Sequence, residues 1–439
     1  MIINRRGFIG GAAALSGAAS VAARPPDAPV PLVLISIDGL RPADVLDVQR
    51  GFDAPVLRAM ARAGQHAARV IGVTPTSTYP SHTTLLTGKR PAEHGIVANQ
   101  PFDPYFRNQD GWYWYYTDVR GTSLWSAARA AGRKTLNIEW PVSVGAPIDL
   151  NIPQYWRSGQ ADDRKLLAAL ATPGLLAEIE KLTGAPYPAG GELEHVAADE
   201  ARGAIAARLI VRHRPLVSTI YLGSLDHVQH QHGPASAPAR ACLVRLDTVV
   251  GAIARAAREA DPRTVVAVVS DHGFAMVTRD VNLFVPFASA GLLRMGPSGG
   301  VAAWDAIPWL MGGSAAIVLA RPRDESLMAR TAAVLREFAA DASNGVDSII
   351  ARAELDKRGA VPTASFMIVL KPGYKTAWSA NALPLGPSDD LGMHGYLPET
   401  ETMAASFFAD GAGVPVSNMG DIAMTEIAPH LAKLIGLTL

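Results

Sequence analysis

Cysteine is almost absent from this chain, since Cys242 is the only one among 439 residues. No disulfide within the chain and no cysteine-built metal site can therefore form. A charge excess is also lacking, because 40 Lys and Arg balance 40 Asp and Glu. Without a basic surplus, the sequence has no electrostatic footprint for nucleic acid as a stable partner. Its 49% content of apolar residues is typical of a globular protein.

A long apolar run is missing from the N-terminus as well. Arg5 and Arg6 precede a mild Gly/Ala-rich run, and small residues continue to Ala23. The run is too short and too weakly apolar to span a membrane, but its layout fits a cleavable export signal. Paired arginines before such a run resemble a bacterial twin-arginine signal, which the twin-arginine export machinery reads. We expect residues 1–23 to be a signal peptide and the mature protein to be periplasmic or secreted, with no stable membrane anchor.

Short apolar runs, rich in β-branched residues, end at acidic residues in three places. Asp38 follows the run 31–37, Asp226 follows the run that begins at 216, and Asp271 follows 265–270. Helical patterns lie between these runs. Alternating strands and helices predict an α/β fold, with a mostly parallel central sheet flanked by helices. Ligands bind at the carboxyl edge of such a sheet, which is where the three carboxylates would lie.

Two long stretches interrupt this alternation. Residues 145–200 are rich in Pro, Gly and aromatic residues, and residues 285–390 carry further strand-like runs. We expect one catalytic domain over residues 30–439, in which both stretches are inserted caps over the sheet. The aromatic runs 111–118 and 154–156 could line a leaving-group pocket or pack a cap, and the sequence leaves both interpretations open.

Histidines accompany the acidic residues. Asp226 and His230 are four residues apart, so a helix would place both on one face, where they could bind one ion. Asp271 and His272 are adjacent, and His394 lies beside glycines. Mixed Asp and His ligands suit Zn²⁺. Together with Asp38, these residues are enough to bind two ions. Two ions could stabilise both the attacking and the leaving oxygen of a phosphoryl transfer.

The segment TPTSTYPSHTTLLTG supplies a candidate nucleophile. A threonine hydroxyl needs activation by a base or a metal. Pro80 suits a first helical turn, and this places Thr78 at or just before a helix N-terminus, which favours an anion such as phosphate. Thr74, Thr76 and Ser77 are the competing hydroxyls nearby, whereas the threonines after Thr78 would lie on the helix as packing residues.

The extended segment TPTSTYPSHTTLLTGKRPAEHGIVAN resembles the nucleophile segment of the nucleotide pyrophosphatase/phosphodiesterase family, within the alkaline phosphatase superfamily. Further matching elements follow in the family's order: Asp38-Gly39, Asp226-x-x-x-His230-x-x-Gly-Pro, Asp271-His272-Gly273 and His394-Gly395-Tyr396. Ser81 stands where the family often has Asn, at a position that is not a ligand. An alkaline-phosphatase-like core is the fold that this resemblance implies.

The same resemblance implies a cofactor set and a mechanism. Two Zn²⁺ ions are expected, one held by Asp226, His230 and His394, the other by Asp38, Asp271, His272 and the Thr78 oxygen. Thr78 would form a covalent phospho-threonine ester that zinc-activated water hydrolyses. Asn99 and the backbone N–H of Tyr79 would hold non-bridging phosphate oxygens of the substrate, and the Tyr79 ring could stack on a base or leaving group. The expected substrate is a small phosphodiester or nucleotide.

Related activities remain alternatives. Thr-nucleophile phosphomonoesterases carry a Lys-x-Arg pair for the extra phosphate charge, and Arg157, Arg164 and Lys165 lack that spacing. A diester carries one charge less, so the sequence favours a phosphodiesterase. A monoesterase, a phosphonoacetate-type hydrolase and a non-catalytic metal-binding protein are the other possibilities. A sulfatase is excluded, because Cys242 lies in RACLVRL and not in the required C/S-x-P-x-R motif.

Overall fold

The computed structural model describes residues 29–108, 111–155, 157, 162–188, 194–297, 299–378 and 383–439. The expected export signal and Trp156 lie outside these ranges. Within them, no helix is both long and apolar enough to cross a lipid bilayer.

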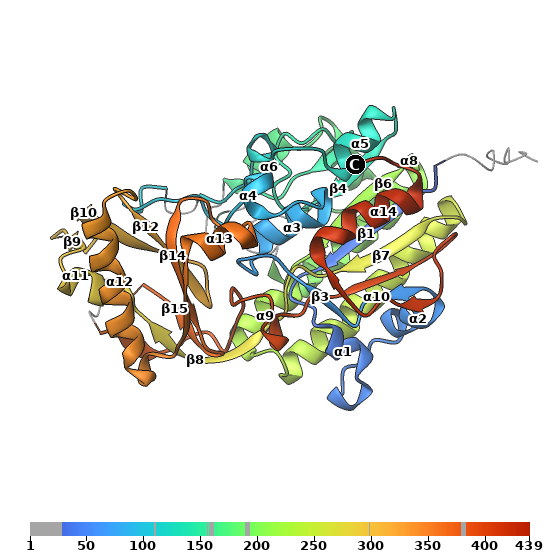
Figure 1. Cartoon of the computed structure of the whole chain (residues 1–439). Helices are drawn as coiled ribbons and strands as arrows, with labels where there is room; N and C mark the ends of the chain where they lie inside the picture. The colour runs from blue at the N-terminus through green and yellow to red at the C-terminus, as the bar shows by residue number, and fades with distance from the viewer. Residues whose placement is uncertain are drawn as a thin grey trace, which may run out of the picture.

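The main sheet has eight strands (Figure 1), and five consecutive neighbours, from β7 to the edge strand β5, run parallel. Its strand β18 is antiparallel to both of its neighbours. The predicted mostly parallel α/β fold is therefore confirmed. The strand order is β19 (Ser417–Asn418), β2 (Gln65–His66), β18 (Phe407–Asp410), β7 (Val265–Val269), β1 (Leu32–Ile37), β6 (Val217–Leu222), β4 (Thr135–Ile138) and β5 (Leu150–Ile152).

Helices cover both faces of this sheet because its central strands are apolar on both sides. Along β1, Leu32 and Leu34 enter one core, while Val33 and Ile35 enter the other. The first core packs against α3 (Thr78–Thr87), α5 (Leu124–Ala130) and α14 (Ile427–Ile435). The second packs against α2 (Pro55–Ala63), α6 (Asp163–Leu170), α7 (Leu175–Thr183), α8 (Val196–His213) and α10 (Ala237–Ala260).

A second sheet stands beside the first, at the left of Figure 1. Its four antiparallel strands are β11 (Ala306–Leu310), β12 (Ser314–Leu319), β14 (Ala364–Leu370) and β13 (Val346–Ala351). The helices of this region are α11 (Phe284–Ser289), α12 (Glu325–Ala340) and α13 (Arg352–Arg358), and β9 (Leu293–Met295) pairs with β10 (Val301–Trp304). Most of the stretch 285–390 therefore folds around a sheet of its own.

The connection between the two sheets is formed by β8 (Ala275–Val281). It pairs with β15 (Gly373–Thr376), β16 (Leu385–Pro387) and β17 (Gly392–Met393).

The stretch 145–200 behaves differently from 285–390. It contributes β5, which pairs in parallel with β4 and becomes the edge of the main sheet. Its residues therefore extend the sheet as well as flank it.

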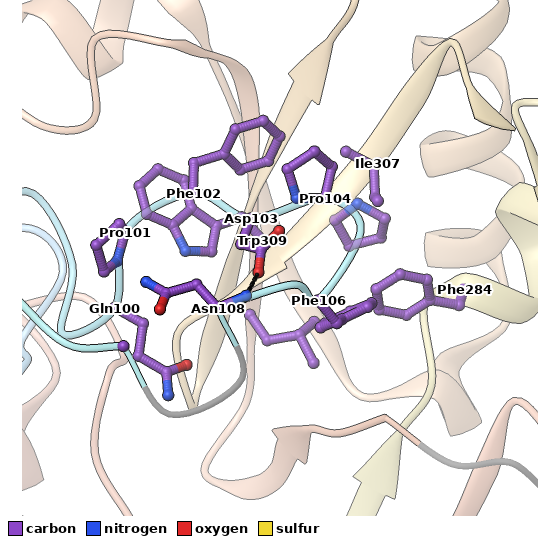
Figure 2. A pocket seen from close by; sticks show the side chains of 13 residues that line it. Gln100, Pro101, Phe102, Asp103, Pro104, Phe106, Asn108, Phe284, Ile307 and Trp309 are labelled. Atoms are coloured by element: carbon purple, nitrogen blue, oxygen red, sulfur yellow. Dashed lines mark hydrogen bonds between the residues drawn. The ribbon is translucent and has the colours of Figure 1, made fainter. Parts of the chain in front are cut away.

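A loop that starts at Asn99 reaches across to the second sheet. Phe102 packs edge-on against Trp304 and tilted against Trp309, with ring centroids 5.8 and 5.3 Å apart. Figure 2 shows Phe102 and Trp309 at a cavity that the loop and β11 line, and this cavity has a volume of about 140 Å³. The N–H of Tyr113 donates to the carbonyl oxygen of Asn99 at 3.0 Å, which brings the two ends of the loop together. The second sheet thus supports a loop whose ends lie next to α3.

Candidate active site

The predicted ligands converge at the carboxyl edge of the main sheet, where the connections leave its central strands. Asp38 follows β1, and Asp271 and His272 follow β7. Asp226 and His230 lie on the short helix α9 (Ser224–His232), which follows β6, and the predicted helical spacing of this pair is confirmed. His394 follows β17, so the long excursion through the second sheet returns to the same place.

These residues form one continuous cluster. His272 Nε2 lies 3.0 Å from Asp271 Oδ2 and 3.5 Å from Asp38 Oδ1. The rings of His272 and His394 stack at 3.7 Å. Asp226 links to His230 at 3.5 Å and to His394 at 3.9 Å. All six Asp and His residues predicted from the sequence therefore lie together.

Thr78 is the first residue of α3, as the sequence predicts, and Ser77 is the N-cap. Its Oγ1 lies 3.4 Å from His272 Nε2, next to the carboxylates. The following threonine, Thr83, donates its hydroxyl to the carbonyl of Tyr79 inside the helix. Thr78 is thus the hydroxyl of this segment that meets the cluster, at a helix end that favours anions.

Asn99 lies next to the nucleophile candidate in an arrangement that the sequence did not suggest. Its Oδ1 accepts the backbone N–H of Tyr79 at 2.9 Å. That N–H is therefore already bound, and it is not available to hold a phosphate oxygen as the resemblance implied. Because the Oδ1 of Asn99 is engaged in this bond, its Nδ2 group is the part of the side chain that can donate to an anion.

The three histidines present the same nitrogen to the cluster. The Nδ1 of His230 contacts the carbonyl of Gly392 at 3.0 Å, and that of His394 contacts the carbonyl of Thr76 at 3.0 Å. The Nδ1 of His272 contacts the carbonyl of Gly273 at 3.2 Å. Since a carbonyl only accepts, each Nδ1 carries a hydrogen, and in the neutral imidazole this leaves the lone pair on Nε2. Histidine ligands of metals are oriented in this way.

Among the described residues, three buried carboxylate oxygens of the cluster have no hydrogen-bond partner. They are Oδ1 of Asp38, Oδ1 of Asp226 and Oδ2 of Asp271. The other oxygen of Asp38 accepts the hydroxyl of Tyr221 at 2.7 Å, and that of Asp271 accepts the N–H of Gly39 at 3.2 Å. Unpaired buried acceptors are costly. Together with the three Nε2 lone pairs, they form a donor set that fits divalent cations.

The pKa values respond to this crowding of charge. Burial and the charges of Asp271 and Asp226 raise the pKa of Asp38 well above its usual range. Burial also raises the pKa of Asp226. For Asp271, burial raises the pKa, but His272 and His82 outweigh it and hold the pKa below the ordinary value. The cluster therefore retains protons on some carboxylates unless cations balance them.

Two groups of side chains are compact enough to hold an ion. One is Asp226, His272 and His394, and the other is Asp38, His82 and Asp271. His272 lies between the two groups, since its Nε2 also approaches Asp38 and Thr78. His82 was not predicted, although its position four residues after Thr78 in a helix is a signal that could have identified it.

His82 is better placed to support the cluster than to bind an ion. Its Nδ1 contacts the carbonyl of Thr78 at 2.8 Å, and its Nε2 contacts the hydroxyl of Ser36 at 2.8 Å. Both ring nitrogens are thus engaged, and ligation would cost one of these bonds. Its ring packs edge-on against Trp140 and Tyr221. His82 therefore ties the first turn of α3 to β1.

A cavity of about 200 Å³ opens beside Thr78. Its lining residues are Asp38, Thr78, Tyr79, Trp112, Glu139, Gln154, Glu194, Arg202, Tyr221, Gly223, Asp226, His227 and His230. Trp112 lies 5.1 Å from the Tyr79 ring, whereas Trp114 is 6% exposed and packs on Tyr155 at 4.5 Å. The aromatic run 111–118 therefore contributes both to the cavity wall and to packing.

Comparison with known proteins identifies the family. The chain matches the type I phosphodiesterase / nucleotide pyrophosphatase family over residues 32–397. It belongs to this family. Human ectonucleotide pyrophosphatase/phosphodiesterase family member 1 is 25% identical over 253 residues, which cover 55% of this chain and 23% of the relative. An uncharacterized pyrophosphatase/phosphodiesterase of Schizosaccharomyces pombe is 27% identical over 254 residues, covering 56% of this chain and 44% of the relative.

The matched regions span less than half the length of these two relatives. Solved structures of the family resemble the fold over nearly the whole chain. Human ectonucleotide pyrophosphatase/phosphodiesterase 5 superposes with a TM-score of 0.63 at 19% identity, over 93% of this chain and 95% of the other. An inactive variant of the murine protein in complex with AMP gives a TM-score of 0.61 at 19% identity, over 94% and 96%.

Proposed function

We propose that this protein is a zinc-dependent phosphodiesterase or nucleotide pyrophosphatase in which Thr78 is the nucleophile. The observation that carries the proposal is the position of Thr78 Oγ1. It lies at the N-terminus of α3 and 3.4 Å from His272 Nε2. A hydroxyl in this position combines an anion-binding helix end with a donor set for cations. Family membership supports the same chemistry.

Seven residues would hold two zinc ions: Asp226, His230 and His394 for one ion, and Asp38, Asp271, His272 and the Thr78 oxygen for the other. The oriented Nε2 atoms and the unpartnered carboxylate oxygens support this set. When bound, the ions supply positive charge that lowers the pKa of a hydroxyl and stabilises phosphate oxygens.

The chain's own residues would position the reaction. The Thr78 oxygen attacks phosphorus and forms a phospho-threonine ester, while the bond from phosphorus to the leaving oxygen breaks. Water then breaks the ester and restores the hydroxyl. The Asn99 side chain is held by the Tyr79 N–H, so its Nδ2 can donate to a non-bridging oxygen. The ring of Tyr79 is 1% exposed and packs against Trp112, so Trp112 is the ring of this pair that offers apolar surface to the rest of the substrate.

The charge of the cavity favours a diester over a monoester. Among the described residues that line the cavity, Arg202 is the one lysine or arginine. Its guanidinium is held by Asp199 and Glu139, so its charge is already balanced. A monoester dianion would need a free cation that this wall does not offer, whereas a diester carries one charge less.

Paired rate measurements on the zinc-loaded protein test the function. The substrates are bis-p-nitrophenyl phosphate, thymidine 5′-p-nitrophenyl phosphate and p-nitrophenyl phosphate, each with and without EDTA. We expect faster cleavage of the two diesters and loss of activity with EDTA. Preference for the thymidine ester would favour nucleotide substrates. Faster cleavage of the monoester would contradict the proposed phosphodiesterase.

A variant pair tests the nucleophile. Thr78→Ala is expected to lower kcat by at least about 10³-fold and to retain the fold and zinc. Thr83→Ala is the matched control, because its hydroxyl lies in the same helix and bonds only to the Tyr79 carbonyl. Equal turnover by the two variants would remove Thr78 from this role.

Export through a twin-arginine signal is part of the proposal. It places the enzyme outside the cytoplasm, where small phosphodiesters or nucleotides would be its substrates. The support is the sequence of residues 1–23 alone.

A further inference from the structure

Three buried charged side chains connect the cavity wall with the helix that carries Asp226. Arg202, in the middle of α8, is 1% exposed. Its guanidinium contacts Asp199 on the same helix and, at 2.5 Å, Glu139 at the end of β4. Glu139 also accepts the hydroxyl of Tyr187 at 2.8 Å. Buried charges persist when they are paired in this way, so the three side chains form one fixed unit.

Asp199 contacts a helix other than its own. Its Oδ2 accepts the N–H of Ser224 at 2.9 Å, and its Oδ1 accepts the N–H of Gly223 at 3.3 Å. These groups begin α9, whose N-cap residue is Gly223 and has no side chain to offer. The first N–H groups of a helix need acceptors, and a carboxylate there also interacts favourably with the helix dipole. Asp199 therefore caps α9 from outside.

The position of Asp226 depends on this cap, whereas the other two carboxylates of the cluster are oriented by hydrogen bonds of their own. Asp38 is oriented by the Tyr221 hydroxyl, and Asp271 by the N–H of Gly39. No hydrogen bond from the described residues orients the carboxylate of Asp226, and its Oδ1 is buried without a partner. Its position is thus set by the backbone of α9, two residues after the capped N–H of Ser224.

We propose that Asp199, fixed by Arg202 and Glu139, is the positioning residue for Asp226 and sets the affinity of the zinc site to which Asp226 belongs. This rests on the proposed function, since Asp226 must be a zinc ligand. Groups that orient a ligand from behind commonly change metal affinity by about 10–100-fold when they are removed. Here the orienting group acts through a helix end.

Zinc titration of the Asp199→Ala variant tests the proposal. Zinc binding is measured against a competing chelator, and visible absorption of the cobalt-substituted protein reports the ligand environment. We expect one of the two ions to bind about 10–100-fold more weakly, with the cobalt spectrum altered. Excess zinc should restore kcat to within about threefold of the parent value, because a positioning group does not touch the reacting atoms.

The matched control is Glu200→Gln, on the next residue of α8. Glu200 forms an exposed ion pair with Arg245, and none of the hydrogen bonds found among the described residues joins it to α9. The Glu200→Gln variant should bind both zinc ions with the affinity of the parent protein. Asp199→Asn keeps an acceptor oxygen for Ser224, so it should lie between the parent and Asp199→Ala. It also provides the decisive comparison if Asp199→Ala does not fold.

The outcomes separate this inference from the proposed function. If the parent protein binds no zinc or cleaves no diester, the proposed function fails. If the parent binds two ions and folded Asp199→Ala and Asp199→Asn bind both with parental affinity, the positioning role is wrong. Weakening of both ions equally, together with a lower melting temperature before zinc is added, would show a general structural role and would also overturn it.

Discussion

Tyr221→Phe isolates one hydrogen bond at the cluster of Asp and His residues that we propose to bind zinc. The Tyr221 hydroxyl donates to Asp38 Oδ2 at 2.7 Å, and Asp38 is 1% exposed. A hydrogen bond to a charged group contributes about 1.5–3 kcal/mol. Because 1.4 kcal/mol corresponds to a tenfold change in an equilibrium constant, the loss corresponds to about 10–150-fold. The phenylalanine ring keeps the edge-on packing against His82, so we expect the fold to be retained.

The expected result is weaker binding of the zinc ion that Asp38 holds, by about 10–100-fold. Competition with a chelator measures this affinity, and thermal melting of the metal-free protein checks the fold. Tyr116→Phe is the control, since its hydroxyl bonds to Ser123 at 2.8 Å, away from the cluster. If Tyr221→Phe binds both ions as tightly as the parent protein, the hydrogen bond does not orient a zinc ligand and the reasoning is refuted.

Three further predictions concern the anion donor, pH and export. Asn99→Ala should lower kcat/KM by about 10²–10³-fold with zinc content unchanged, because Asn99 is bound to the Tyr79 N–H and not to the cluster; normal diester turnover would contradict its role. Burial raises the pKa values of Asp38 and Asp226 above the ordinary carboxylate range, so zinc binding should displace protons, and zinc affinity should still increase with pH above that range. Calorimetry at several pH values measures this affinity, and an affinity that does not change with pH would contradict the prediction. Expression of the full chain in a bacterium should give a periplasmic product whose N-terminus lies near Ala23, and mutation of Arg5 and Arg6 to Lys should retain it in the cytoplasm.

Local sequence determined much of the site. Asp38 and Asp271 could be placed at strand ends because short β-branched runs end there, and parallel strands present their carboxyl ends at one edge. The spacing of Asp226 and His230 fixed their common helix face. The position of Thr78 followed from Pro80, which suits the first turn of a helix. In each case the evidence lies within a few residues, where backbone geometry leaves few choices.

Long-range packing decided the rest. Tyr221 lies on β6 and orients Asp38, which directly follows β1, because parallel pairing sets those two strands side by side. Asp199 caps α9 only because α8 packs against it, and no local pattern joins the two. His394 reaches the cluster after a complete second sheet. Such contacts depend on the register and packing of distant segments, so the sequence identified the candidate ligands, whereas the tertiary structure decided what holds them in place.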